Sequence, residues 1–364
     1  YATGGGGIGM DGSGNGTIRA LVRNCTFEGN TCSLQAVSRG AAVFVTGSVG
    51  AVIEPQFIGC TFRDNYSGDD GGALAFNVTS TDLLARSFSA LRVDSCLFEN
   101  NESVGQFGRG GAIWMLTGSN TESHNVISNS RFINNVAGGN GGAVFNRASF
   151  VLSLADDRII NCFFSGNQSQ QDGGALYFRG SQSATNTGQA VNCVFYNNQA
   201  ALNGGAVFST SFSSEAGTSQ NQLLNCSFYG NAAQLEGGAV YLDGAAGGVN
   251  EMAINNSILW ENSASSAEKE IFNNGGTLSL SHNIIQGGYS SPANQEAIQT
   301  ADPLFLDPAN GSLLLSPCSP AINAGLNDFL PIDYLDLDAD LDSLERLDID
   351  LNGDNRLFES ITDL

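Results

Sequence analysis

The sequence predicts an all-β fold: a single right-handed parallel β-helix (solenoid) of about 8–10 coils with an acidic C-terminal cap segment. Two repeated blocks predict it. The first is a Phe-x-x-Asn block preceded by Cys or Ser, and its copies follow one another every 31–36 residues. The second is a Gly-Gly-Ala-aliphatic block that comes after each first block. Both blocks are short, β-branched or aromatic, and bounded by Gly and Asn, so they are typical of strands.

The first block predicts a strand whose Phe and Cys side chains point inward. Its copies lie at residues 24–30, 59–65, 95–101, 129–135, 161–167, 192–198, 225–231 and, in degenerate form, 256–262. Strand alternation predicts that Leu224, Cys226 and Phe228 share one face. Because like residues stack in successive coils, we expect one buried column, with one ring per coil: Phe27, Phe62, Phe98, Phe132, Phe164, Phe195 and Phe228.

The cysteines of this block share one register and predict a second buried column. Its members are Cys25, Cys60, Cys96, Cys162, Cys193 and Cys226. Free cysteine is among the most buried residue types, so packing is the preferred interpretation. Disulfides between adjacent coils are the alternative in an export compartment. Metal binding by these thiols is not expected, because only His124 and His282 accompany them and no Cys-x-x-Cys occurs.

The second block predicts a strand with two further columns on opposite faces. An aliphatic column is followed one residue later by an aromatic one: Phe44, Trp114, Phe145, Tyr177, Phe208 and Tyr241, interrupted by Ala75. If the aliphatic column fills the core, the aromatic side chains form an outer stripe that could bind a partner or stack on sugars. If the aromatic side chains fill the core, the column is packing, which we favour. Polar loops after this strand, such as 117–122 and 211–217, would form one variable face.

The two blocks together resemble the repeats of chlamydial polymorphic outer membrane proteins and of bacterial parallel β-helix surface proteins. Residues 301–308 (ADPLFLDP) and 315–325 (LSPCSPAINAG) resemble the terminal signature of choice-of-anchor Q proteins. That resemblance implies a secreted β-helix followed by an anchoring or sorting signal. It is not specific for any activity. We therefore expect three regions: a β-helix over 1–290, a capping segment over 291–325 and an Asp-rich tail over 326–364.

The tail contains the most specific chemical motif of the chain. Residues 348–359 match the twelve-residue calcium loop D-x-[DN]-x-[DN]-G-x5-E. Calcium takes six to eight oxygen ligands, so this pattern predicts a calcium site. A solvated acidic tail is the alternative. The predicted ligands are Asp348, Asp350, Asn352, Asp354 and Glu359, with the preceding acids Asp336, Asp338, Asp340 and Asp342 contributing.

Composition excludes several function classes. The 364 residues carry 36 acidic and 14 basic side chains, a formal net charge of −22. Such a chain is not expected to bind nucleic acid or an anionic bilayer. No apolar run is long enough for a transmembrane helix. Catalysis is not expected, because the chain has one lysine, Lys269, no Gly-His-Gly segment and only isolated acidic pairs, at 69–70 and 156–157.

The predicted function is an extracellular or cell-surface structural or adhesive scaffold, stabilised by calcium. Residues 5–8 are a variant of the second block, so the chain is expected to begin within a coil whose edge could accept another chain. The expected partners are a second copy, joined head-to-tail into filaments, or an extracellular polysaccharide. The alternative is a polysaccharide-binding module, and less favoured is a polysaccharide lyase or hydrolase of pectin-lyase-like fold.

Overall fold

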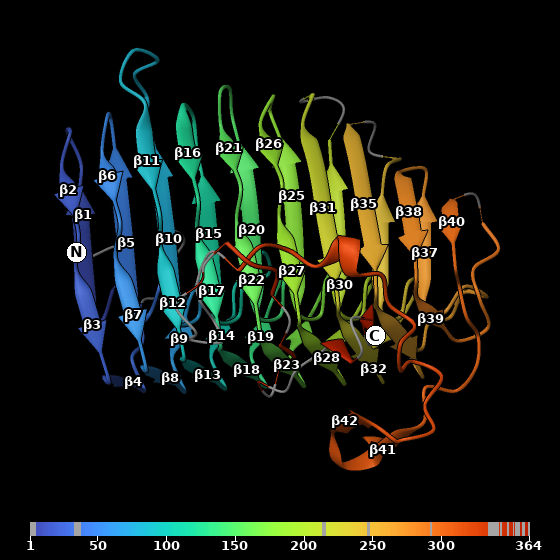
Figure 1. Ribbon diagram of the computed structural model, residues 1–364. Coiled ribbons are helices and arrows are strands. Elements are labelled where there is room, and N and C mark those ends of the chain that lie inside the picture. Colours follow the sequence, from blue (N-terminus) through green and yellow to red (C-terminus); the bar gives the residue numbers. More distant parts are fainter. Residues whose placement is uncertain are drawn as a thin grey trace.

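The chain folds into a parallel β-solenoid, as the sequence predicts (Figure 1). The computed structural model describes residues 5–32, 38–212, 216–245, 248–291, 293–333, 342, 344–347, 349–351 and 353, and the backbone of 357–358 and 361–362. Four parallel sheets run along the rod, and each coil contributes to them in turn. Among the described residues, no helix is long and apolar enough to span a membrane.

Sheet I contains the Gly-Gly-Ala strands, and sheet II contains the strands that follow them. Sheet I comprises β1 (Ile8–Gly12), β5 (Val43–Ser48), β10 (Leu74–Thr79), β15 (Ile113–Thr117), β20 (Val144–Ser149), β25 (Leu176–Ser181), β30 (Val207–Ser211), β34 (Val240–Asp243) and β37 (Ile271–Asn274). Sheet II comprises β2 (Thr17–Ile18), β3 (Leu21–Arg23), β6 (Val52–Ile53), β7 (Gln56–Ile58), β11 (Ser87–Ser89), β12 (Arg92–Asp94), β16 (Thr121–Ser123), β17 (Val126–Ser128), β21 (Leu154–Ala155), β22 (Arg158–Ile160), β26 (Thr185–Asn186), β27 (Gln189–Val191), β31 (Thr218–Leu224), β35 (Val249–Asn255), β38 (Thr277–Ser281) and β40 (Asn294–Glu296).

Sheet III contains the Phe-x-x-Asn strands, and sheet IV contains the short strands after them. Sheet III comprises β4 (Thr26–Glu28), β8 (Thr61–Arg63), β13 (Leu97–Glu99), β18 (Arg131–Ile133), β23 (Phe163–Ser165), β28 (Val194–Tyr196), β32 (Ser227–Tyr229), β36 (Ile258–Trp260) and β39 (Ile284–Ile285). Sheet IV comprises β9 (Tyr66–Ser67), β14 (Glu102–Ser103), β19 (Val136–Ala137), β24 (Gln168–Ser169), β29 (Gln199–Ala200) and β33 (Ala232–Ala233).

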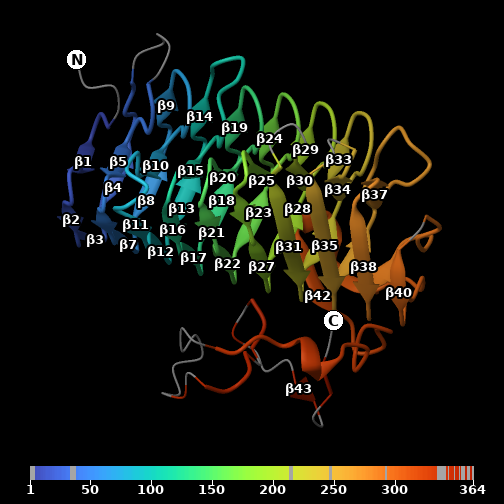
Figure 2. The same ribbon diagram turned by 90° about the horizontal axis from the view of Figure 1, so that it is seen from above.

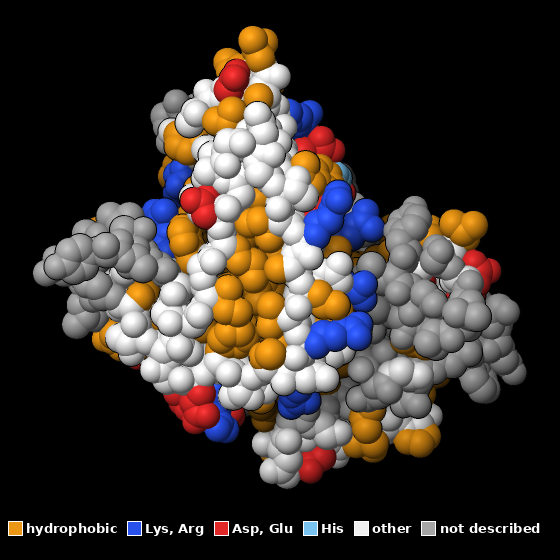
Figure 3. Space-filling view, turned by 90° about the vertical axis from the view of Figure 1, so that its left-hand side faces the viewer, with side chains coloured by type: hydrophobic (Ala, Val, Ile, Leu, Met, Phe, Trp, Pro, Cys, Tyr) orange, Lys and Arg blue, Asp and Glu red, His pale blue; other side chains and the backbone are white. Residues whose placement is uncertain are grey.

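The predicted phenylalanine column forms the centre of the core. Consecutive rings from Phe27 to Phe228 stack with centroids 4.6–5.1 Å apart and planes within 3–7° of parallel. The register that was assigned to the first block is therefore confirmed. Viewed from the end that carries β1, hydrophobic side chains gather in the middle of the exposed end, and backbone and uncharged polar side chains surround them (Figure 3).

The prediction that Leu224 shares a face with Cys226 and Phe228 is wrong, because the chain turns between Leu224 and Cys226. Asn225 lies between β31 and β32 with a φ of 53°. This left-handed residue ends the strand alternation, and asparagine tolerates the conformation better than most residues do. Consequently Leu223 faces the core, while Leu224 faces outward and packs against Leu347. Cys226 and Phe228 remain inward, but Leu224 does not share their face.

A buried asparagine ladder marks the corner after sheet III. The side chains of Asn30, Asn65, Asn101, Asn135, Asn167, Asn198, Asn231 and Asn262 lie one above another. Each Nδ2 donates to Oδ1 of the next asparagine at 2.8–2.9 Å. The ladder ends where Asn262 Nδ2 donates to Glu270 Oε2 at 2.6 Å. Because Glu270 is buried, its pKa is raised to about 8.

The cysteine column is a column of free thiols. Five of its members are buried, whereas Cys25, in the first coil, is exposed. Burial raises the pKa of Cys96 to about 12 and raises those of Cys193 and Cys226 well above the ordinary value. A thiol that stays protonated is a poor nucleophile, so the column has the chemistry of packing.

After β40 the chain leaves the coils and folds back along the side of the solenoid as a separate layer (Figure 2). This C-terminal segment contains β41 (Phe305–Asp307), η2 (Pro308–Asn310), β42 (Ser312–Leu315), η3 (Asn327–Phe329), β43 (Leu357–Phe358) and β44 (Ile361–Thr362). Tyr196 Oη donates to the carbonyl of Pro308 at 3.0 Å, and Asn256 exchanges two hydrogen bonds with the backbone of Leu326. The segment is therefore held by specific contacts to the coils.

Candidate functional site: a polar groove on sheet II

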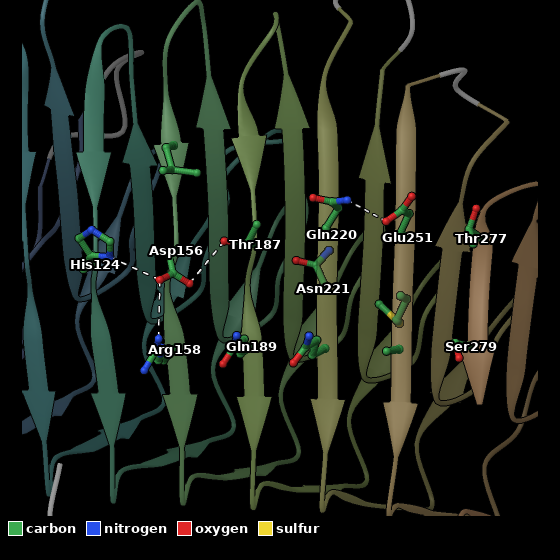
Figure 4. A pocket seen from close by; sticks show the side chains of 14 residues that line it. His124, Asp156, Arg158, Thr187, Gln189, Gln220, Asn221, Glu251, Thr277 and Ser279 are labelled. Atoms are coloured by element: carbon green, nitrogen blue, oxygen red, sulfur yellow. Dashed lines mark hydrogen bonds and ion pairs between the residues drawn. The ribbon is translucent and has the colours of Figure 1, made fainter. Parts of the chain in front are cut away.

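A groove of about 720 Å³ lies on the outer face of sheet II (Figure 4). Its floor is made by outward-pointing side chains of consecutive coils, which the parallel register aligns in rows along the rod. Row 1 consists of His124, Asp156, Thr187, Gln220, Glu251 and Thr277. Row 2 lies two residues further along each strand and consists of Arg158, Gln189, Gln222, Ala253 and Ser279.

The charged side chains of the groove contact neighbours in the same or the adjacent coil. Asp156 lies 3.4 Å from His124 and 3.7 Å from Arg158. His124 also contacts Glu122 at 3.0 Å. Further along row 1, Gln220 donates to Glu251 at 2.7 Å. Arg158 thus has a carboxylate partner, whereas Glu251 is bonded to a neutral amide, so the groove presents no excess of positive charge.

The uncharged polar side chains of the groove are available for a ligand. Gln189, Gln222, Thr277 and Ser279 make no side-chain hydrogen bond to any part of the chain that the structure describes. Amides and hydroxyls both donate and accept. The floor can therefore form hydrogen bonds with a ligand whose polar groups also both donate and accept.

The C-terminal segment covers the next outward row of sheet II. Ile160, Val191 and Leu224 each follow a row 2 residue by two positions, and they pack against Leu347 together with Phe329 and Ile349. This cluster buries the row that would otherwise continue the floor. The segment therefore limits the groove on that side.

The acidic pair at 156–157 is divided between the two faces of the sheet. Asp156 points into the groove, whereas Asp157 is buried and accepts hydrogen bonds from Ser123 Oγ at 3.0 Å and the backbone of Asn125 at 2.9 Å. Burial raises the pKa of Asp157. Neighbours in a strand face opposite sides, so the two carboxyl groups cannot act on one substrate.

The acidic pair at 69–70 has a structural environment. Asp70 is fully buried and receives a two-pronged contact from Arg109, at 2.8 and 2.7 Å, and a third from Arg39 at 3.2 Å. Burial, with the nearby charge of Asp70, raises the pKa of Asp69. Both arginines also lie over the ring of Trp114. The pair therefore holds a corner of the coil together.

The aromatic column lies on the opposite face from the aliphatic column, as predicted, and it is buried in a second hydrophobic cluster, separate from the central core. Trp114, Phe145, Tyr177, Phe208 and Tyr241 form a separate outer cluster with only 1–6% of each side chain exposed, and Phe44 is partly buried beside it. From Phe145 to Phe272 the rings stack at 4.9–5.4 Å. Because the rings cover one another's faces, little ring face is left for stacking on a sugar. A binding role for this column stays a prediction.

Most of the predicted calcium ligands lie outside the described residues. These are Asp336, Asp338, Asp340, Asp348, Asn352, Asp354 and Glu359. Of the predicted set, Asp342 and Asp350 are described. Within the described part of the chain, no three His, Cys, Asp or Glu side chains are grouped closely enough to hold a metal ion. Calcium binding stays a prediction.

Four segments, residues 129–147, 161–179, 192–210 and 225–243, match the Chlamydia polymorphic membrane protein repeat. Each segment begins at the left-handed asparagine before sheet III and runs through the ladder asparagine and the Gly-Gly-Ala corner into sheet I. These four segments of the chain are similar to that repeat. Each such repeat occupies the same part of a coil, so the sequence repeat and the structural repeat coincide. The predicted resemblance to these repeats is confirmed, while the choice-of-anchor Q resemblance stays a prediction.

One curated relative is similar to part of this chain. The probable autotransporter YfaL of Escherichia coli (strain K12) is 37% identical over 82 residues, which are 22% of this chain and 6% of that protein. The chain therefore spans only a small part of the length of this relative. Together the repeats and the relative point to a β-helical protein of the outer membrane or cell surface.

The groove residues were not identified from the sequence. Row 2 residues that precede a first block lie three positions before the residue that begins it. Gln189 and Gln222, for example, lie three positions before Asn192 and Asn225. Their side chains vary between coils, so they do not stand out as a column. The signal that could have found them is the outward register: polar residues two positions apart on strands whose alternate residues are apolar.

Proposed function

We propose that this chain is the rod of a cell-surface protein, with a structural or adhesive role. The observation that carries the proposal is the occupation of successive coils by polymorphic membrane protein repeats. A solenoid of this kind exposes a long, rigid surface, and rigid scaffolds are suited to presenting binding residues. The polar groove on sheet II is one open part of that surface.

The test of location is surface labelling of cells that produce the protein with its native flanking sequence. A rod on the outside is reached by an antibody against the repeats and by added protease while the cells remain intact. Protection of the rod in intact cells, with cleavage only after lysis, would contradict the proposal. A periplasmic protein and an outer-membrane protein with known exposure serve as controls.

Calcium stabilisation is a further part of the proposal. Its support is the loop motif at 348–359 and the density of acidic residues before it, which would repel one another without bound cations. Chelation is expected to lower the melting temperature or to expose the tail to protease, and Asp350→Asn should reduce the calcium response. Equal melting and digestion with chelator and with calcium would remove this part of the proposal.

Self-association end to end is also proposed. Because the coils are all parallel, the rod has two different ends, and a contact between unlike ends propagates instead of closing. The stacked phenylalanine and asparagine columns could continue across such a joint. Light scattering and electron microscopy at micromolar concentration should then show particles longer than one rod. A strictly monomeric particle, with and without calcium, would contradict self-association.

A further inference from the structure

We propose that the groove on sheet II binds a neutral, linear polysaccharide that lies along the axis of the rod. The inference rests on the proposed surface location, because such a ligand is available outside the cell. It differs from the predicted use of the aromatic column, whose ring faces are stacked on one another. It assigns the ligand to rows 1 and 2, whose residues had no assigned role.

The repeat of the groove favours a polymer. Neighbouring coils are about 4.8 Å apart, so rows 1 and 2 present a polar side chain at each step along the rod. Gln189 and Gln222 are aligned neighbours in row 2, and Ser279 continues the row beyond Ala253. An extended β-linked sugar chain repeats over a similar distance. Successive sugars would therefore lie over successive coils, each of which presents at least one polar side chain of rows 1 and 2.

The chemistry of the floor favours a hydroxyl-rich ligand. Within the groove, two primary amides and two hydroxyls make no side-chain hydrogen bond to the described residues: those of Gln189, Gln222, Thr277 and Ser279. These groups match sugar hydroxyls, which also donate and accept. The rigid sheet fixes the spacing of the backbone positions that carry these groups, while the glutamine side chains themselves must be ordered when a ligand binds.

The charge of the groove argues against a polyanion. Arg158 and His124 are the basic groups that line it, and both contact Asp156. Glu251 adds a further carboxylate to row 1. The chain as a whole has a formal charge of −22. A polyuronate or a nucleic acid would therefore be repelled.

The backbone of the groove argues against a peptide. Strands that capture peptides by β-augmentation offer an unpaired edge. Here β31 is hydrogen-bonded to β27 on one side and to β35 on the other, and β35 is paired again with β38. Of the apolar side chains that line the groove, Met252 is almost fully buried and Leu154 is partly exposed.

The experiment is isothermal titration calorimetry of the full chain with neutral hexasaccharides of β-1,4-linked glucose, N-acetylglucosamine, mannose and xylose. Polygalacturonate and an uncharged unstructured peptide are titrated in parallel. At least one neutral hexasaccharide should bind. The double variant Gln189→Ala/Gln222→Ala should weaken that binding about tenfold or more, because each amide contributes about one net hydrogen bond or more.

The matched control is Gln56→Ala. Gln56 lies in line with row 2, because the strand register aligns it with Arg92, then Val126 and then Arg158. Its side chain is exposed and lies outside the groove. Its removal should leave binding unchanged, and all variants should melt within a few degrees of the parent protein. Equal loss in the control and double variants would show that binding occurs elsewhere and would overturn the assignment.

Two further outcomes also overturn the inference: no binding of any neutral hexasaccharide, or binding of only polygalacturonate or the peptide. These outcomes leave the surface location intact, because antibody labelling of intact cells measures it independently. Conversely, the rod could be protected from antibody and protease in intact cells while the purified chain still binds a hexasaccharide. That result would reject the proposed surface location and retain the binding site.

Discussion

Single residues contribute to this fold mainly through columns, because each side chain meets its equivalents above and below. Phe164 stacks on Phe132 at 4.7 Å and on Phe195 at 5.1 Å. Asn167 receives one ladder bond and donates the next. A substitution therefore disturbs two interfaces at once, one on each side of its coil.

Replacing Phe164 with alanine should destabilise the protein by ~3–5 kcal/mol, since it leaves a cavity in a fully buried stack. Urea unfolding followed by circular dichroism measures the change. The control is Phe107→Ala, which removes a side chain that is 68% exposed and should cost less than about 0.5 kcal/mol. Equal effects of the two substitutions would contradict the core position of the column.

Glu270 should make stability depend on pH. Its pKa is raised by burial to about 8, so the folded state keeps a proton that the unfolded state releases at lower pH. The contribution of this group is fully present below its ordinary pKa, near 4.5, and is lost as the pH rises towards 8. Stability should therefore fall across this window by an amount on the order of a few kcal/mol.

The variant Glu270→Gln tests this assignment. Its carbonyl can still accept the 2.6 Å bond from Asn262, and it carries no titratable group. The pH dependence of the melting temperature between the two limits should become flatter than in the parent. Glu296→Gln, which changes an exposed carboxylate that does not contribute to the shift at Glu270, should leave the pH dependence as it is. An unchanged slope in Glu270→Gln would exclude Glu270 as its source.

At the scale of elements, the C-terminal segment is the part that does not follow the repeat. Hydrogen bonds between asparagine side chains of the coils and the backbone of the segment hold it in place. The side chain of Asn192 bonds to Ile349 at 2.7 Å, and that of Asn256 bonds to Leu326 at 3.0 and 2.9 Å. These asparagines have φ values near 50° at the corner between sheets II and III. The corner residue therefore serves both the turn and the docking of the segment.

Asn256→Gly should loosen the C-terminal segment while keeping the turn. Glycine accepts the left-handed conformation, but it removes both hydrogen bonds to Leu326. Limited proteolysis with mass spectrometry should show cleavage of residues after 290 at least several times faster than in the parent. The matched control is Asn129→Gly at the equivalent corner, where Asn129 bonds to Asp94 and not to the segment. Equal cleavage rates in both variants would reject this docking contact.

At the scale of the whole molecule, the excess of acidic residues opposes a compact state. The net charge of −22 implies self-repulsion that salt can screen. Raising the ionic strength from about 0.01 M to about 0.15 M with sodium chloride, in the presence of chelator, shortens the screening length from about 30 Å to about 8 Å. The melting temperature should rise measurably. A fall with salt would mean that favourable ion pairs outweigh the repulsion.

The sequence by itself determined the coil. Its repeat period, its phenylalanine and asparagine columns, and the opposite faces of the Gly-Gly-Ala strand all follow from local alternation and from the stacking of like residues. The groove and the docking of the C-terminal segment were decided only by the tertiary structure. The left-handed corner at Asn225 reverses the faces of its neighbours, so Leu224 points outward. Whether such an outward residue is buried or open then depends on contacts with residues more than a hundred positions away, such as Leu347, which no local pattern encodes.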